Sequence, residues 1–421
     1  MVYLHGGAFV SGAKSMTNLS PKFLIRHDVI VVAINYRLGP YGFLCLSEPG
    51  FSNQGLKDQV LALKWIKDNI GAFGGDVERI TAFGQSAGAM TLDIQLLANE
   101  NLVQRAVLQS GSALTTWVIA TQNDSIPISM AGKLGYTGKE VKGAMEYLST
   151  KDPMEVIQSA NDLHILNASN HPLTRPCVET LGDDALLTDF PVNLKPKVNG
   201  MDLMIGHTDK EVVFLYPKQS DTAYYKNYRF EDELAKDFDK IYDEDTIRHF
   251  YIGDKVLGAD LQSDILDYGT DFVFCYPTER TVERYLNANA SKVYRYIFSY
   301  EGGRNSGKIR RNLTSPGACH GDDLGYLFDR TMFENKVTKK DQNMIDIMTT
   351  MWTNFAKYGN PTPSTSDLIS VLWRPVETSR RPFLNLNKPI KLDYRPFQKR
   401  MAFWELYYKL HGDKEKGYKR H

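Results

Sequence analysis

A strand-like run that ends in a Gly-x-Ser-x-Gly turn and continues into a helix-like run limits the folds open to this chain. The strand-like run covers residues 79–83, the turn covers residues 84–88 and the helix-like run covers residues 87–98. The serine on such a turn is strained and exposed, and the flanking glycines let backbone and substrate approach closely. Free N–H groups at the start of the helix favour negative charge beside it. The pattern predicts a nucleophile, Ser86, at the end of a strand.

Short apolar runs alternate with helix-like stretches along the chain. Val60, Leu63, Ile66 and Ile70 recur at helical spacing, so we expect a helix with one apolar face over residues 56–70. The β-branched run 29–34 indicates a strand buried on both faces, as in a parallel sheet. Further strands are expected at 80–83, 106–108, 203–205 and 293–298. This alternation predicts βαβ units and an α/β fold.

We expect one domain over residues 1–421, because no repeat or low-complexity linker divides the chain. The segments 120–195 and 216–285 are more polar and helical, and we interpret them as excursions over the catalytic face. Neither segment carries the pattern of a separate domain.

The composition excludes several classes of function. The chain is 42% hydrophobic and 24% charged with zero formal net charge, which gives no electrostatic case for binding nucleic acid or an anionic membrane. No run of 18 apolar residues predicts a membrane span. No motif implies a metal or an organic cofactor. The favoured interpretation of the cysteines is buried free thiols, although four cysteines allow several pairings: Cys45, Cys177, Cys275 and Cys319.

A serine nucleophile needs a base, and the base needs a carboxylate to orient it. After a turn of this type the acid and then the histidine follow in chain order. The histidines more than 100 residues beyond the serine are His207, His249, His320, His411 and His421. His320 is the favoured base, because it lies in a glycine-flanked loop after the strand expected at 293–298. The alternative is an ordinary surface-loop histidine.

The ordered motifs resemble those of the type-B carboxylesterase and cholinesterase family, which are α/β-hydrolases. The resemblance covers essentially the whole chain and is strongest to insect carboxylesterases, including juvenile hormone esterase-like members. It implies a mostly parallel central sheet with helices on both faces. The matching motifs are HGGAF (5–9), NYRLGPYGFL (35–44), NQGLKDQ (53–59), FGGD (73–76), GQSAG (84–88), QSGS (109–112), the turn at Glu211, the loop at His320 and WTNFAKYGNP (352–361).

The resemblance implies a catalytic triad of Ser86 as nucleophile, Glu211 as acid and His320 as base. The donors to the oxyanion would be the backbone N–H groups of Gly6, Gly7 and Ala87. Glycines suit this role because they let the loop bring amides close to the developing charge, and each lost donor typically costs about 3–4 kcal/mol.

Further residues match supporting positions of the family. Ser110 matches a serine that hydrogen-bonds the triad acid. Gln85 stands before the nucleophile, and Asp323 stands where the family often has a buried Glu near the site. Trp117 and Phe214 match aromatic positions near the substrate gorge, with plain core packing as an equally weighted alternative.

The chain departs from the family pattern beside the triad. Gln85 replaces the usual Glu, which removes a negative charge beside the oxyanion and the imidazolium. Insect members, including juvenile hormone esterases, also have Gln there. Val212 replaces the usual Gly after the acid, and a β-branched residue disfavours positive φ. The acid turn is therefore expected to differ, with Asp209 as the reserve candidate for the acid.

The chain also lacks roughly the first hundred residues of the family pattern, so early strands are missing and a long unpaired sheet edge is expected. Residues 1–4 then correspond to the tail of a strand, which suggests a fragment, a short isoform or a misplaced start. No signal peptide is visible in residues 1–30. The family's C-terminal disulfide is absent, because Cys275 has no partner near Met401.

The resemblance implies a serine carboxylic ester hydrolase that acts on a small-molecule ester through an acyl-enzyme. Xenobiotic esters, odorant or pheromone acetates and juvenile hormone are candidate substrates, and a cholinesterase is disfavoured. The alternative is an impaired or non-catalytic member that binds or sequesters ligands or acts in adhesion. Five N-x-S/T sequons suggest the secretory pathway: Asn18, Asn123, Asn167, Asn289 and Asn312.

Overall fold

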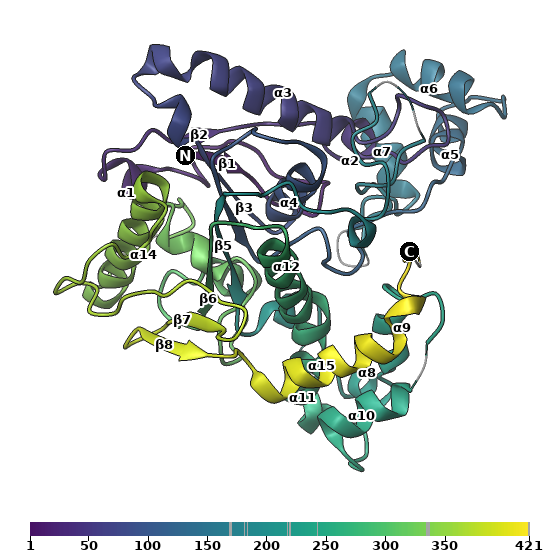
Figure 1. The fold of residues 1–421 in the computed structure, drawn as a ribbon. Helices are drawn as coiled ribbons and strands as arrows, with labels where there is room; N and C mark the ends of the chain where they lie inside the picture. The colour runs from purple at the N-terminus through teal and green to yellow at the C-terminus, as the bar shows by residue number, and fades with distance from the viewer. Residues whose placement is uncertain are drawn as a thin grey trace.

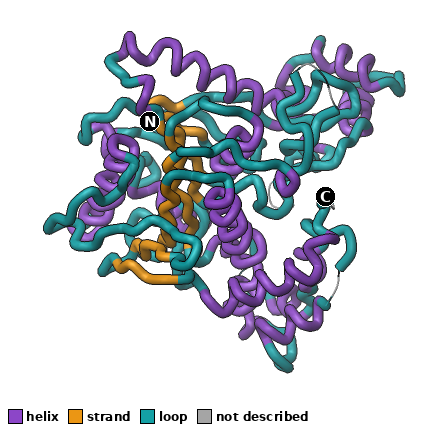
Figure 2. The backbone as a smooth tube through the Cα atoms, viewed as in Figure 1, coloured by secondary structure: helices purple, strands orange, loops and turns teal. Residues whose placement is uncertain are grey.

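The chain folds around an eight-stranded sheet in a computed structural model that describes residues 1–167, 171–180, 182, 184–216, 218, 220–241, 243–333 and 337–419. The strand order is β2-β1-β3-β4-β5-β6-β7-β8, and only β8 runs antiparallel to its neighbour. Helices flank the sheet on both sides (Figures 1 and 2). The strands are β1 (Val2–Leu4), β2 (Val32–Ala33), β3 (Thr81–Gln85), β4 (Arg105–Gln109), β5 (Asp202–Thr208), β6 (Lys292–Phe298), β7 (Pro382–Leu386) and β8 (Lys391–Tyr394).

Two apolar layers bury the faces of the sheet. One face packs against α3 (Gln54–Asn69), α4 (Ala87–Ala98) and α12 (Tyr276–Asn287), and the other against α1 (Lys22–Ile25) and α14 (Lys339–Tyr358). Successive strand residues point to opposite faces. In β5, Leu203 and Ile205 therefore join the first layer, whereas Met204 joins the second. Burial on both faces explains the continuous apolar runs of the central strands.

The remaining helices belong mainly to the connections between strands. The helices α5–α7 form a separate apolar cluster, and α8–α11 pack with α15 in an aromatic-rich one (Figure 1). These groups follow β4 and β5, at the strand ends where ligands bind in open parallel sheets. The bounds are α2 (Gly39–Gly42), α5 (Ser125–Lys133), α6 (Val141–Ser149), α7 (Pro153–Asp162), α8 (Thr222–Lys226), α9 (Phe230–Leu234), α10 (Glu244–Ile252), α11 (Gln262–Thr270), α13 (Ser306–Arg311) and α15 (Gln398–His411).

The edge of the sheet differs from the expectation. Residues 29–34 were expected to form a strand buried on both faces, but β2 has only two residues, both half-buried, and pairs with β1 alone. An apolar run reports burial and not the number of neighbouring strands. The edge is therefore short, rather than the long unpaired edge that was expected.

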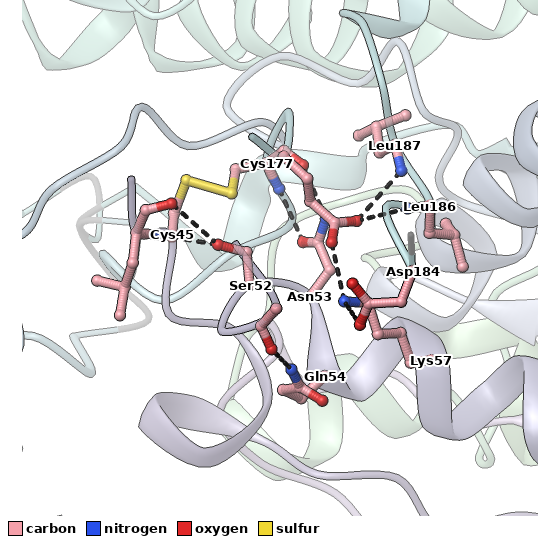
Figure 3. A network of polar contacts seen from close by, with 12 residues as sticks. Cys45, Ser52, Asn53, Gln54, Lys57, Cys177, Asp184, Leu186 and Leu187 are labelled. Carbon is pink, nitrogen blue, oxygen red and sulfur yellow. Dashed lines mark hydrogen bonds and ion pairs between the residues drawn. A yellow bond between two sulfur atoms is a disulfide. The ribbon is translucent and has the colours of Figure 1, made fainter. Parts of the chain in front are cut away.

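The expectation of four free thiols was wrong. Cys45 and Cys177 form a disulfide with a Cα–Cα distance of 6.0 Å, whereas Cys275 and Cys319 are free and buried. Asn53 supports the disulfide by exchanging hydrogen bonds with the backbone of Cys177, at 2.8 Å and 3.0 Å (Figure 3). The two half-cystines are 132 residues apart, and no local spacing relates them.

Within the described residues, the structure contains no helix with the length and apolar character that a bilayer span requires. In the same part of the chain, no three His, Cys, Asp or Glu side chains are grouped as metal ligands.

Candidate active site

Ser86 lies on a sharp turn between β3 and α4. Its backbone has φ 58° and ψ −129°, a conformation that costs free energy in a residue with a Cβ. Glycines make the turn possible, because a side chain would not fit at either position. A Cβ on Gly84 would lie 2.5 Å from the backbone of Gly88, and one on Gly88 would lie 2.1 Å from Leu4 O. Ser86 N donates to Gln109 O at 2.9 Å, which ties the turn to β4.

Glu211 and His320 meet beside this turn. Glu211 begins the 3₁₀ helix η5 (Glu211–Phe214) just after β5, and its Oε2 lies 2.5 Å from His320 Nδ1. His320 is 7% exposed and Glu211 is fully buried, so the pair is largely screened from water. A carboxylate on Nδ1 favours the tautomer in which that nitrogen carries the proton. The other ring nitrogen, Nε2, is then free to act as an acceptor.

The carboxylate of Glu211 is held on both oxygens. Thr208 N donates to Oε1 at 2.7 Å, and His320 occupies Oε2. Burial raises the pKa of Glu211, but the charge and hydrogen bond of His320, together with Ser110, outweigh burial and bring the pKa below its usual value. Glu211 is therefore an anion at neutral pH, as the orienting acid of a triad requires.

Gln85, the residue before the turn serine, contacts the free nitrogen of His320. Gln85 Nε2 lies 3.1 Å from His320 Nε2, and Gln85 is buried. Ser86 Oγ makes no hydrogen bond to any residue that the structure describes. Gln85 thus covers the imidazole nitrogen. The family resemblance placed Gln85 beside the imidazolium but named no atom that it contacts.

The loop at residues 5–9 approaches the turn serine closely. A Cβ on Gly6 would lie 2.5 Å from Gln85 O and 2.9 Å from Ser86 Cβ, so only glycine fits. Gly7 has φ 131°, which side-chain-bearing residues rarely adopt. The backbone N–H groups of Gly6 and Gly7 donate to no described residue. Ala87 opens α4, so its N–H also lacks a helical partner.

The loop that carries His320 is anchored on both sides. Asp322 accepts hydrogen bonds from Cys319 N at 2.6 Å and Lys308 N at 3.0 Å. Asp209, the reserve candidate for the acid, accepts from Ala318 N at 2.7 Å. Burial raises the pKa of Asp209 to about 6. The structure thus brings Asp209 to the backbone of this loop, whereas Glu211 contacts the imidazole.

The other residues predicted to support the site lie near Glu211. Ser110 is buried next to Glu211, and its N donates to Gly206 O at 2.8 Å. Asp323 accepts from Gln109 Nε2 at 2.7 Å and from Tyr296 OH at 3.3 Å. Burial raises the pKa of Asp323 to about 6, the Gln109 hydrogen bond opposes this rise and Glu211 adds to it.

Two aromatic rings pack against the His320 imidazole. Phe214 stacks on His320 with ring centroids 5.1 Å apart, and Phe274 lies at the same distance. The guanidinium of Arg311 lies 4.5 Å from the Phe214 ring. Phe214 was predicted near the gorge, whereas Phe274 and Arg311 were missed because neither lies in a recognisable motif.

Trp117 lies in a second aromatic group. Its ring stacks on His171 with centroids 4.7 Å apart and meets Phe9 edge-on at 6.0 Å. Burial lowers the pKa of His171 to about 3, and the charges of Lys236 and Arg175 lower it further. His171 is therefore a neutral aromatic surface at physiological pH. No sequence signal distinguished it from other histidines.

The sequence over residues 1–404 matches the pattern of the carboxylesterase family. The chain belongs to this family. It is 29% identical over 443 residues to bile salt-activated lipase of Rattus norvegicus, covering 97% of this chain and 70% of the lipase. It is 32% identical over 400 residues to juvenile hormone esterase of Tribolium castaneum, covering 86% of this chain and 67% of the esterase. Insect esterases are thus among the relatives of this carboxylesterase.

The fold agrees with this family. The structure of juvenile hormone esterase from Manduca sexta, which has OTFP covalently attached, superposes with a TM-score of 0.82 at 25% identity. The superposition covers 97% of this chain and 80% of that one. The carboxylesterase therefore has the α/β-hydrolase fold that its motifs predicted.

Proposed function

We propose that this carboxylesterase hydrolyses carboxylic esters through an acyl-enzyme, with Ser86 as nucleophile, His320 as base and Glu211 as the orienting acid. The observation that carries the proposal is the 2.5 Å contact between Glu211 Oε2 and His320 Nδ1 beside the strained serine turn. A carboxylate, an imidazole and a serine from separate segments are the groups that nucleophilic catalysis uses. The contact of His320 with Gln85, the neighbour of Ser86, supports their proximity.

In the first half-reaction, Ser86 Oγ attacks the ester carbonyl carbon while His320 Nε2 takes the hydroxyl proton. Gln85 has to release that nitrogen before this transfer. Glu211 stabilises the imidazolium, and the N–H groups of Gly6, Gly7 and Ala87 donate to the oxyanion. His320 then returns the proton to the departing alcohol oxygen as its bond to the acyl carbon breaks.

The second half-reaction repeats these roles with water. His320 removes a proton from water, whose oxygen attacks the acyl carbon. The tetrahedral intermediate collapses by breaking the bond to Ser86 Oγ, which recovers the proton from His320. The products are a carboxylic acid and the free serine. No cofactor is required for these steps.

The substrate is proposed to be a small ester with apolar parts on both sides of the carbonyl. Half-buried Phe214 beside His320 offers one apolar contact for it, and half-buried Trp117 beside Phe9 offers another. The insect relatives named above motivate juvenile hormone-like esters as the first substrates to compare with short acetates and xenobiotic esters. Ligand sequestration without turnover is the alternative function.

We further propose that the protein folds in the secretory pathway. Disulfides persist mainly in oxidising compartments, and the chain has one between Cys45 and Cys177. Three sequon asparagines are exposed: Asn18, Asn289 and Asn312. The sequon at Asn167 extends outside the described residues. Glycan mass on protein from a secreting cell tests this proposal.

A fluorophosphonate probe tests the proposed chemistry directly. Wild-type protein should gain one adduct by intact mass and lose ester turnover, and Ser86→Ala should gain none. Heat-unfolded wild type controls for non-specific labelling. Absence of the adduct on folded monomer would overturn the proposal. An adduct without ester turnover would support sequestration instead.

A further inference from the structure

Buried polar side chains lie beneath the turn that carries Glu211, and the proposed reaction does not use them. His207 on β5 is fully buried, and Arg295 on β6 is 1% exposed. Ile205 pairs with Arg295 in the sheet, so Arg295 and His207 project from the same face. Buried polar groups in an apolar layer destabilise the fold unless they find partners.

Arg295 has partners on two sides. Glu279 of α12 forms an ion pair with its guanidinium, and Arg295 Nη2 lies 3.3 Å from His207 Nε2. A guanidinium has only donors, so His207 Nε2 is the acceptor. Burial, together with the positive charge of Arg295, lowers the pKa of His207 to about 4. The His207 imidazole is therefore neutral at physiological pH.

The tautomer decides what His207 does on its other side. Because Nε2 accepts, the proton is on Nδ1, which lies 2.8 Å from Thr208 O. Cys275 Sγ is more distant from this nitrogen, at 3.7 Å. Thr208 N in turn donates to Glu211 Oε1 at 2.7 Å. Hydrogen bonds to the Thr208 backbone thus connect the buried pair of Arg295 and His207 with the Glu211 carboxylate that meets His320.

We propose that Arg295 and His207 are positioning residues that fix the Thr208 backbone and, through it, the Glu211 carboxylate in the orientation His320 needs. This inference rests on the proposed function of the triad. Neither residue contacts the site where the ester would bind. Their loss should therefore lower kcat by misplacing the base and leave KM nearly unchanged.

Three substitutions of His207 separate its two contacts. His207→Asn places an amide nitrogen near the position of Nδ1, so it keeps the donor to Thr208 O. His207→Gln places an amide oxygen near the position of Nε2, so it keeps the acceptor for Arg295. His207→Leu removes both contacts at similar volume. We expect kcat to fall about 10- to 100-fold in the Leu and Gln variants and less than about 10-fold in the Asn variant.

Arg280 provides the matched control for Arg295. It is a partly buried arginine with 16% of its side chain exposed, and it pairs with Glu415 at 2.8 Å and 2.6 Å rather than with a residue of the acid turn. Arg280→Met should lower the melting temperature without changing kcat per folded molecule. Arg295→Met should lower both quantities. Active-site titration with the fluorophosphonate probe supplies the concentration of folded molecules for each kcat.

The outcomes distinguish this inference from the proposed function. If the wild-type protein shows no Ser86-dependent turnover, both the proposed function and this inference fail. With an active wild type, the inference fails if His207→Leu keeps the wild-type kcat, or if His207→Gln is more active than His207→Asn. Equal loss of kcat in Arg280→Met and Arg295→Met would show that Arg295 contributes only to stability, and the inference would fail in that case as well.

Discussion

Gln85 Nε2 lies 3.1 Å from His320 Nε2, on the nitrogen that the proposed reaction uses as base. An amide N–H stabilises the neutral imidazole, because it donates to the lone pair of Nε2. A carboxylate at the same position can only accept, so it would stabilise the imidazolium instead. The identity of residue 85 therefore decides whether His320 Nε2 meets a hydrogen-bond donor or an acceptor.

Gln85→Glu should shift the acidic limb of the pH dependence of kcat/KM to higher pH, by about one unit or more. The added anion favours protonated imidazole, so a higher pH is needed to free the base. The measurement is a pH–rate profile on a neutral ester. Gln85→Ala, which adds no charge, serves as the control. A limb that stays in place in the Glu variant would show that residue 85 does not face the base.

Glu211→Gln should reduce kcat by about 10³- to 10⁴-fold, because an amide cannot stabilise the imidazolium as an anion does. Asp209→Asn should reduce it less than about 10-fold, since Asp209 contacts the backbone of the His320 loop. Steady-state kinetics on both variants provide the comparison. The reverse order of effects would move the acid to Asp209.

Gly6→Ala should lower kcat at least about 100-fold. The new Cβ would lie 2.5 Å from Gln85 O, which forces the proposed oxyanion loop away from Ser86. Gly71→Ala is the matched control, because a Cβ there meets no atom within 4 Å. Kinetics and melting curves of both variants test the prediction. Normal turnover in Gly6→Ala would exclude this loop from the site.

Replacing Cys45 and Cys177 together by Ser should lower the free energy of unfolding by about 2–5 kcal/mol. The disulfide closes a long loop, so its loss returns conformational freedom to the unfolded chain. Urea unfolding of the double variant and of reduced wild type gives the comparison. The two should agree within error, and an unchanged urea midpoint in both would rule out a stabilising disulfide.

Asp271 should make stability depend on pH. Burial raises its pKa to about 7, although Arg400 at 2.8 Å opposes this rise. Between about pH 4 and 7 the folded protein keeps a proton that the unfolded chain releases. The free energy of unfolding therefore falls as pH rises through this window, by at most about 1.4 kcal/mol per unit.

Asp271→Asn should flatten that dependence, because the amide does not titrate. Urea unfolding at several pH values between about 4 and 8 measures the slope. The exposed Asp68→Asn variant is the control and should keep the wild-type slope. Equal slopes in all three proteins would assign the pH dependence to other groups.

Much of the fold was predictable because its core signals are local. The helix expected at 87–98 is α4, and the strands expected at 106–108 and 293–298 lie within β4 and β6. The extent and burial of the strand expected at 29–34 were wrong, because a central strand and an edge strand can have the same apolar sequence pattern. Sequence periodicity reports burial, whereas strand neighbours are decided by the whole topology.

The site was predictable to the extent that its residues stand in motifs. Physical reasoning selected Ser86 and favoured His320, but the choice between Glu211 and Asp209 depended on the family resemblance. The family resemblance placed Gln85 beside the imidazolium but not on a particular nitrogen, and the pairing of His207 with Arg295 had no sequence signal. Their partners are 235 and 88 residues away, so only the folded chain brings them together.

The disulfide between Cys45 and Cys177 also decides how the protein would behave toward proteases. Any single cut between these residues, for instance near the exposed Lys139, leaves both pieces covalently joined. A nicked molecule would therefore migrate at full mass on a denaturing gel until a reductant is added. Purified material that looks intact without reductant can already have been cleaved in the segment that contains Trp117.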